Sequence, residues 1–181
     1  ISGGNAVFNP EKLEWFNNQH IMRLPAETLA DRVEPLLRAA GTWDEAFAGA
    51  RRAWLLSVIE LLKPRAHRLQ DFVAQAQPLV SDAIEYDAAA VGKHLSPAGT
   101  RAHLEALRAA LAGLPAFDAA SIEPAVRGLA EARGVKAGTL IHAARVSGTG
   151  RTVSPGIFEV LELLGRERVL ARLDRAMAMA G

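Results

Sequence analysis

The chain has 181 residues, half of them apolar, a formal net charge of +1 at neutral pH and no cysteine. This apolar fraction is enough for the core of one domain or of two small ones. Without cysteine the chain forms neither disulfides nor thiolate metal sites, and it fits a reducing cytosol. Charged residues interrupt every apolar stretch and no signal peptide is visible, so we expect a cytoplasmic protein with no membrane partner. Because the first residue is Ile1 rather than methionine, we expect a fragment of a longer protein.

Apolar residues recur at spacings of three and four, and no segment alternates with a period of two, so the sequence predicts an all-α fold. Asn9 and Pro10 suit the cap and the first position of a helix that runs to about residue 21. Pro25 opens a second helix, which Pro35 should bend or divide.

The third helix should be long. Thr42 can cap it, its apolar residues from Trp43 to Leu61 share one face, and it must end before Pro64. The segment Lys63–Arg65 is then a turn that holds two cations at a helix junction. A further helix covers about residues 67–77 and ends at Pro78.

The second half of the chain should contain shorter helices. We expect helices over about residues 97–112 and 121–133, a helix through Arg145 followed by a loop that contains Gly148 and Gly150, and a final pair divided at Gly165. The core candidates of the final pair are Phe158, Leu161, Val169, Leu173 and Met177.

Charge is unevenly distributed along the chain. Residues 51–68 and residues 133–175 each carry a net +4, and the remainder carries −7. Such segregation lets two basic segments face one polyanion if the fold brings them together. The alternative is that exposed helix faces simply carry arginines.

The residues offer little support for catalysis. The segment Gly148–Gly150 lacks the third glycine of a dinucleotide loop, and neither a Gly-Lys-Ser/Thr loop nor a Gly-x-Ser-x-Gly elbow occurs. The five histidines have no paired ligand spacing. The acidic residues Asp82, Glu85 and Asp87 fit a solvated surface better than a site. We therefore expect no catalytic residue and no metal.

Three segments, in order, carry a resemblance to a known family: Ala6–Asn17, Leu61–Arg65, and Thr139–Arg151 with Ser154–Phe158 and Leu163–Arg168. In these segments the chain resembles the C-terminal, anticodon-binding part of bacterial glutamyl-tRNA synthetases of class I. The resemblance implies two consecutive helical bundle subdomains. Residues 1–24 would be a junction segment after the catalytic half, residues 25–80 the first subdomain and residues 81–181 the second.

The resemblance also implies a function. The chain would bind and discriminate the anticodon of tRNA(Glu) within an enzyme that ligates glutamate to that tRNA. L-glutamate, ATP and Mg²⁺ would bind the catalytic half of a monomeric parent. The HIGH-type and KMSKS-type motifs of that half are absent from this sequence, so we expect this chain alone to be inactive and to hold no cofactor.

Arg65 is the implied reader of the third anticodon base, which is cytosine for glutamate and guanine for glutamine. Cytosine presents its O2 and N3 acceptors to a guanidinium, whereas guanine presents the N1–H and N2–H donors, which would oppose those of Arg65. The alternative is an arginine that only caps helix carbonyls near the turn.

Arg145 and Ser154 are implied to read the first two anticodon bases or the adjoining backbone. Pro155, Ile157 and Phe158 would supply apolar surface under the bases. Because Phe158 also falls on the core face of its helix, we expect Ile157 to make the direct contact. Departures from the family pattern leave the base-by-base assignment open, since Ala143 replaces a frequent proline and Ser154 replaces threonine or glycine.

Other side chains are assigned more generally. We expect contacts to the tRNA backbone from Lys63, Arg51, Arg52, Arg166 and Arg168, because charge matters there and base identity does not. Trp15, Asn17 and Asn18 resemble family positions near the inner corner of the tRNA and the catalytic junction, although a tryptophan such as Trp15 is more often a core residue. The alternative function is a freestanding helical protein-interaction module without tRNA binding, and a small independent enzyme is the third reading.

Overall fold

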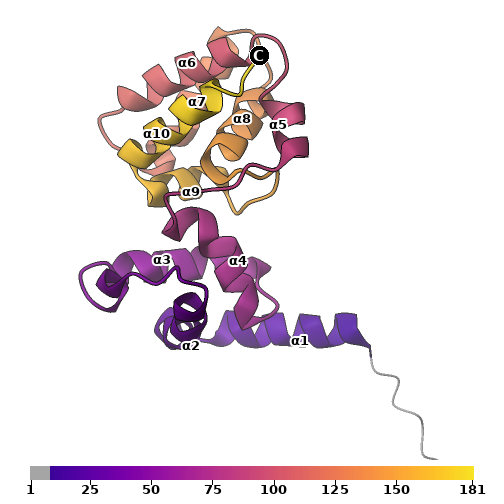
Figure 1. The fold of residues 1–181 in the computed structure, drawn as a ribbon, viewed down its shortest axis with the longest axis vertical. Helices are drawn as coiled ribbons and strands as arrows, with labels where there is room; N and C mark the ends of the chain where they lie inside the picture. The colour runs from indigo at the N-terminus through magenta and orange to yellow at the C-terminus, as the bar shows by residue number, and fades with distance from the viewer. Residues whose placement is uncertain (1–8) are drawn as a thin grey trace, which may run out of the picture. The chain divides into compact units, whose positions relative to one another are not determined.

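The computed structural model describes residues 9–181, so Ala6, Val7 and Phe8 of the first resembling segment lie outside the described residues. From residue 9 onward the chain forms helices and connecting segments but no strand, which confirms the predicted all-α class (Figure 1). Contacts divide the chain into two compact units, the first ending at Ala76 and the second beginning at Gln77. The predicted subdomain boundary lies between residues 80 and 81.

The first unit contains α1 (Pro10–Arg23), α2 (Ala26–Ala39), the short 3-10 turn η1 (Glu45–Ala48), α3 (Arg52–Leu62), the 3-10 turn η2 (Lys63–Arg65) and most of α4 (Leu69–Val80). Helix α1 begins as predicted, because the Asn9 side chain accepts a hydrogen bond from the backbone N–H of Lys12 and Pro10 follows the cap. Helix α2 packs against α3, and η2 lies against α1. The core of this unit includes Leu29, Val33, Leu37, Phe47, Leu55, Val58, Ile59, Leu62 and Phe72.

The predicted long third helix is wrong at its start. The helix begins at Arg52, because Asp44 caps the separate turn η1 and Gly49 has φ −143° and ψ −103°, outside the helical region. The aromatic residues of this stretch still meet. The ring centroids of Trp43 and Phe47 lie 5.5 Å apart, as do those of Phe47 and Trp54.

Both prolines that were expected to break helices lie inside them. Pro35 does not divide α2, and α4 continues past Pro78 to Val80, so the predicted end before Pro78 is wrong. A proline removes one N–H donor and strains the preceding turn. Pro78 lies in the last turn of α4, two residues before its end.

The second unit contains the end of α4 and six further helices: α5 (Ala88–His94), α6 (Thr100–Ala112), α7 (Ala119–Ala132), α8 (Ala137–Thr149), α9 (Ile157–Leu164) and α10 (Arg166–Met177). Helix α8 contacts α5, α6, α7, α9 and α10 and is therefore the centre of the unit. Figure 1 shows α6 and α10 packed along each other. The core includes Leu104, Leu107, Leu111, Ile122, Val126, Leu140, Val146, Val160, Leu161, Val169 and Leu173.

Two elements of this unit differ from the prediction. Helix α5 is not among the predicted elements, and Asp87 caps it by accepting a hydrogen bond from the backbone N–H of Ala90. Helix α8 includes Gly148 and ends at Thr149, so only Gly150, with φ +73°, belongs to the predicted loop. The division at Gly165, with φ +79°, is confirmed. Leu161, Val169 and Leu173 are buried as predicted, whereas Phe158 and Met177 are half-buried.

Candidate nucleic-acid interface

The turn η2 holds Arg65 on a fixed backbone. The Asn18 side-chain amide donates hydrogen bonds to the carbonyl oxygens of Lys63, at 3.3 Å, and Ala66, at 2.8 Å. The Gln75 amide donates to the carbonyl oxygen of Arg65 itself, at 3.1 Å. The Arg65 side chain is exposed, and among residues 9–181 its guanidinium forms no hydrogen bond or ion pair. The turn therefore presents an unpaired cation whose backbone position is set by two amides.

Lys63, in the same turn, is arranged in the opposite way. It is buried, and its ammonium donates to the carbonyl oxygen of Leu24 at 3.0 Å and to Glu60 Oε1 at 3.1 Å. An ammonium removed from water requires such partners. Contact between Lys63 and tRNA phosphates stays a prediction, and it would require this cation to leave the partners with which it closes the turn against α1 and α3.

The other predicted phosphate ligands of the first unit are engaged within the unit. Arg51 forms an ion pair with Asp44 at 3.2 Å, and its guanidinium carbon lies 4.2 Å from the ring centroid of Trp54. Arg52 pairs with Glu27 and, at 2.6 Å, with Asp31. Their contact with phosphates stays a prediction, and it would require these carboxylates to be exchanged for phosphate.

The two predicted phosphate ligands on α10 are also engaged. Arg166 donates to the carbonyl oxygen of Leu114, and its guanidinium carbon lies 5.5 Å from the ring centroid of Phe117. Arg168 donates to the carbonyl oxygen of Leu79 at 2.7 Å and pairs with Asp82 at 2.9 Å. Their assignment to tRNA phosphates likewise stays a prediction.

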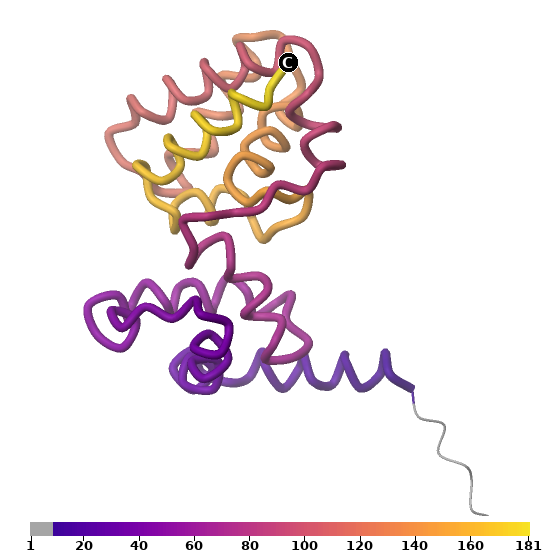
Figure 2. The backbone as a smooth tube through the Cα atoms, viewed as in Figure 1, coloured from indigo at the N-terminus to yellow at the C-terminus, as the bar shows by residue number. Residues whose placement is uncertain are grey.

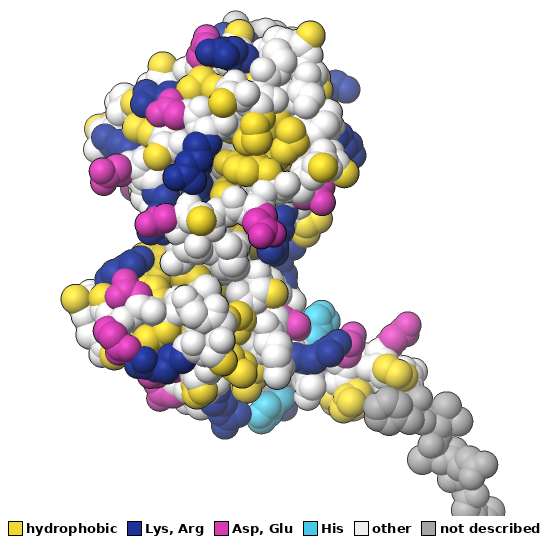
Figure 3. Space-filling view, in the orientation of Figure 1, with side chains coloured by type: hydrophobic (Ala, Val, Ile, Leu, Met, Phe, Trp, Pro, Cys, Tyr) yellow, Lys and Arg dark blue, Asp and Glu magenta, His cyan; other side chains and the backbone are white. Residues whose placement is uncertain are grey.

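These ion pairs bear on whether the uneven distribution of charge along the sequence produces a basic surface. Apart from Glu60, which pairs with Lys63 inside its own segment, the carboxylates paired with the two basic segments come from outside those segments: Glu14, Glu27, Asp31, Asp44 and Asp82. On the face drawn in Figure 3, basic and acidic side chains are interspersed over each unit. Segregation along the sequence therefore does not produce a uniformly basic surface on that face, and individual unpaired cations become the better candidates for recognition.

The structure brings Arg145 and Ser154 together. The Arg145 Nε–H group donates to Ser154 Oγ at 3.1 Å, and Ser154 Oγ–H donates to the carbonyl oxygen of Pro155 at 2.8 Å. On the opposite side, Arg145 NH1 lies 3.2 Å from His142 Nδ1. The Ser154 hydroxyl uses its one hydrogen on Pro155, so it can offer a base only an acceptor. Its main effect is to orient Arg145.

The predicted order of the two apolar contacts is wrong. Ile157 is only 3 % exposed, because it shares the core face of α9 with Val160, Leu161 and Leu164. Phe158 lies beside that face, is half-buried, and has the Arg127 guanidinium 5.9 Å from its ring centroid. Phe158 rather than Ile157 is accessible to a partner.

Arg172, a buried polar residue of the second unit, is not among the predicted site residues. Its side chain is 1 % exposed, and its guanidinium donates to the carbonyl oxygens of Gly148 and, at 2.7 Å, of Ser81. Burial, reinforced by the neighbouring cation Arg168, lowers the pKa of Arg172 to about 10, so the residue remains charged at neutral pH.

The segment from residue 81 to residue 87 is tied to the end of α8 in two further places. The Tyr86 hydroxyl donates to the carbonyl oxygen of Ser147 at 3.2 Å, and burial raises the pKa of this tyrosine. The backbone N–H of Asp87 donates to the carbonyl oxygen of Gly150 at 2.9 Å.

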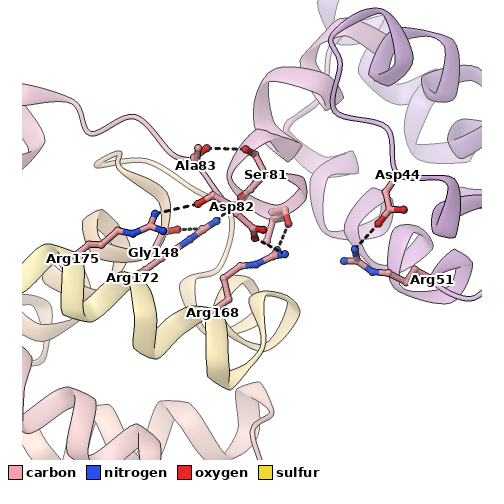
Figure 4. Close-up of polar contacts among 10 residues, drawn as sticks. Asp44, Arg51, Ser81, Asp82, Ala83, Gly148, Arg168, Arg172 and Arg175 are labelled. Atoms are coloured by element: carbon pink, nitrogen blue, oxygen red, sulfur yellow. Dashed lines mark hydrogen bonds and ion pairs between the residues drawn. The ribbon is translucent and has the colours of Figure 1, made fainter.

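The sequence contains a pattern that could have indicated the role of Arg172, because the arginines at positions 168, 172 and 175 share one face of α10. All three point toward the segment that follows α4, and Arg175 donates to the carbonyl oxygen of Asp82 at 3.3 Å (Figure 4). This arginine row fixes the backbone beside the end of α8, four residues after Arg145 on that helix.

The N-terminal part of α1 projects beyond the other helices of the first unit (Figure 2). Trp15 is 56 % exposed there, together with Leu13, Phe16 and Asn17, which disfavours the alternative of a core residue. The predicted place of Trp15 near the inner corner of the tRNA stays a prediction. Asn18 is the only one of the three predicted junction residues with a hydrogen-bonding role in the described part of the chain.

Neither a metal centre nor a membrane span is found in the described part of the chain. No group of three or more histidine, cysteine, aspartate or glutamate residues between residues 9 and 181 is placed to bind a metal ion. None of the described helices is both long enough and apolar enough to cross a bilayer.

Comparisons with known proteins place the chain in a family. A family model described as "Anticodon binding domain" matches residues 28–177. Glutamate–tRNA ligase from Moorella thermoacetica is 35% identical and glutamate–tRNA ligase 2 from Koribacter versatilis is 40% identical, each over 97% of this chain and 36% of the relative. The crystal structure of a glutamate tRNA ligase from Elizabethkingia meningosepticum superposes with a TM-score of 0.80 at 26% identity, covering 94% of this chain and 32% of that one.

The chain thus spans little more than a third of the length of the relatives it matches. The matched residues run from within α2 to the end of α10, and therefore include both the Arg65 turn and the Arg145–Ser154 pair. The chain belongs to the anticodon-binding domain family, in the form found in glutamate–tRNA ligases.

Proposed function

We propose that this chain binds the anticodon loop of tRNA(Glu) and discriminates it from that of glutamine tRNA. The observation that carries the proposal is the exposed, unpaired guanidinium of Arg65 on a turn fixed by Asn18 and Gln75. Fixing the backbone reduces the entropy lost when the side chain binds a base. Membership of the anticodon-binding domain family supports a tRNA loop as the partner.

Arg65 would donate to the O2 and N3 atoms of the third anticodon base, cytosine. Guanine at this position would place N–H donors against the guanidinium, and the unpaired buried donors would cost about 2 kcal/mol. Arg145, oriented by Ser154, would contact another base or the adjoining backbone, and Phe158 would offer an aromatic ring for stacking.

The parent protein would ligate glutamate to this tRNA in the cytoplasm as a monomer. ATP, Mg²⁺ and L-glutamate would bind its catalytic half, and residues 1–24 would join that half to two anticodon-binding subdomains, residues 25–80 and 81–181. The family relationship supports this assignment, since the matched relatives are named glutamate–tRNA ligases. We expect no aminoacylation by the 181-residue chain alone, because its sequence lacks both catalytic motifs.

The test is a titration of the 181-residue chain with glutamate tRNA at low and moderate salt. Binding to phosphates releases counterions, so affinity should fall as salt rises. The fall should be steep for a domain that binds the phosphate backbone of tRNA, and it should accompany saturable binding at low salt. Absence of binding at low salt would overturn the proposal.

One observation favours the alternative function, a protein-interaction module. Leu13, Trp15 and Phe16 leave an apolar surface exposed on α1. The same titration separates the two functions, because a module without tRNA binding gives no saturable signal with tRNA at any salt concentration.

A further inference from the structure

Arg145 has a second neighbour that the anticodon-binding function does not explain. His142 lies one turn earlier on α8, and its Nδ1 atom is 3.2 Å from Arg145 NH1. A guanidinium has only donors, so a hydrogen bond at this distance requires Nδ1 to accept. His142 must then be neutral and carry its hydrogen on Nε2.

A second histidine packs on this ring. His94, the last residue of α5, stacks on His142 with ring centroids 4.7 Å apart and an interplanar angle of 18°. Burial, followed by the charges of His142, Lys93 and Arg145, lowers the pKa of His94 and favours its neutral form. The cations Lys93 of α5 and Arg145 of α8 thus both oppose protonation of His94.

The contacts form a directional series of hydrogen bonds. Arg145 donates to His142 through NH1 and to Ser154 through Nε, and Ser154 donates onward to the carbonyl oxygen of Pro155. Two acceptors on different edges of the guanidinium fix the rotation of its plane. Protonation of His142 removes one acceptor and places a like charge beside Arg145.

We propose that neutral His142, packed on His94, is a positioning residue for the anticodon contact of Arg145, and that protonation of this histidine pair releases the arginine. The proposal rests on the proposed function, since Arg145 must contact the tRNA for binding to respond. Histidine titrates between pH 5 and 8, and the lowered pKa of His94 places protonation of the pair toward the acidic end of that range, so tRNA affinity should fall from pH 8 to pH 5. Simple charge attraction predicts the opposite sign, because protonated histidines attract a polyanion more strongly.

The test measures binding of glutamate tRNA to the 181-residue chain at pH 8 and pH 5. Wild-type affinity should fall about tenfold, as expected for the loss of one hydrogen bond to a charged group. His142→Asn can place its amide oxygen near the position of Nδ1 and does not titrate, so it should bind as the wild type does at pH 8 and lose most of the pH response. His142→Ala should bind about tenfold more weakly already at pH 8.

His103→Ala is the matched control, because His103 Nδ1 accepts a hydrogen bond from Arg133 at 2.8 Å in an exposed pair of the same unit. This variant should keep the wild-type affinity and pH response. A wild-type affinity that rises toward pH 5, or a His142→Asn variant with an unchanged pH response, would overturn the proposal.

An NMR measurement without tRNA separates this proposal from the proposed function. Imidazole nitrogen shifts at pH 8 should show His142 with an unprotonated Nδ1 and a protonated Nε2. The opposite tautomer overturns the positioning role even if the tRNA binds. The expected tautomer in a chain that binds no tRNA at low salt instead contradicts the proposed function.

Discussion

Arg172→Met tests whether the buried arginine stabilises the second unit. The substitution keeps most of the side-chain volume and removes the donors to the carbonyl oxygens of Gly148 and Ser81. Leaving two buried carbonyls without donors costs about 2 kcal/mol each. Removing the cation also relieves a desolvation penalty of about 3 kcal/mol in the folded state, because the pKa of Arg172 is lowered from 12.5 to about 10.

The methionine side chain buries little more apolar surface than the stem of the arginine. The substitution also removes the link from α10 to the segment beside α8, so the net change in the free energy of unfolding remains unfavourable. We expect a loss of about 1–2 kcal/mol and a fall of roughly 5–15 °C in the Tm of the second unit. Arg101→Met is the control, since that arginine is 62% exposed and pairs only with Glu105 on its own helix. Its effect should stay within about 0.5 kcal/mol.

The chain offers a way to assign the change to one unit. Its three tryptophans, Trp15, Trp43 and Trp54, all lie in the first unit. Tryptophan fluorescence therefore follows the first unit, whereas far-ultraviolet circular dichroism follows the helices of both. Arg172→Met should lower the midpoint of the circular dichroism transition of the second unit. It should leave the fluorescence transition of the first unit unchanged. A variant as stable as the wild type, or more stable, would refute the reasoning and show that desolvation of the cation outweighs its hydrogen bonds.

Two further substitutions test the local structure of each unit. Asn18→Asp replaces the donor to the Lys63 and Ala66 carbonyls by a carboxylate, so the tryptophan-detected stability should fall by about 2 kcal/mol, while Asn17→Asp, at an exposed neighbour, should have little effect. An equal loss in both variants would contradict the anchoring role of Asn18. Gly150→Ala would place Cβ 2.0 Å from the carbonyl oxygen of Glu85 at φ +73°, so circular dichroism should show a loss of about 3 kcal/mol or more, whereas Gly128→Ala, in an open helix position, should be neutral or stabilising. A Gly150→Ala variant of wild-type stability would show that the 85–86 segment moves freely.

Local sequence signals predicted much of the helical architecture. The Asn9 cap and the Gly165 division act through a few neighbouring residues, and both are confirmed. The start of α3 was not predictable from apolar spacing. Trp43, Phe47 and Trp54 meet around a turn and a helix, and this packing has almost the same sequence spacing as one continuous helix.

Prediction of the candidate site from the sequence is limited in the same way, because it does not include tertiary packing. The resemblance identified Arg145 and Ser154, which the structure joins, but it could not reveal which cations are neutralised by distant carboxylates. Arg52 meets carboxylates more than twenty residues earlier, and Arg168 meets one more than eighty residues earlier. Lys63 and Arg65 are two residues apart, yet one is buried and the other exposed, since the 3-10 turn directs them to different surroundings. Such differences arise from tertiary packing, which charge counting does not include.

Recognition of the third anticodon base is proposed to depend on Arg65. The most direct measurement compares two glutamate tRNA transcripts that differ only in cytosine or guanine at this base, with the wild type, Arg65→Gln and Arg68→Gln. Arg68 is an exposed arginine three residues away that pairs with Glu14, so its variant makes the same change in charge. Arg65→Gln should reduce the preference for cytosine by roughly thirty-fold, equivalent to about 2 kcal/mol, while Arg68→Gln should preserve it. An unchanged preference in Arg65→Gln would contradict the account.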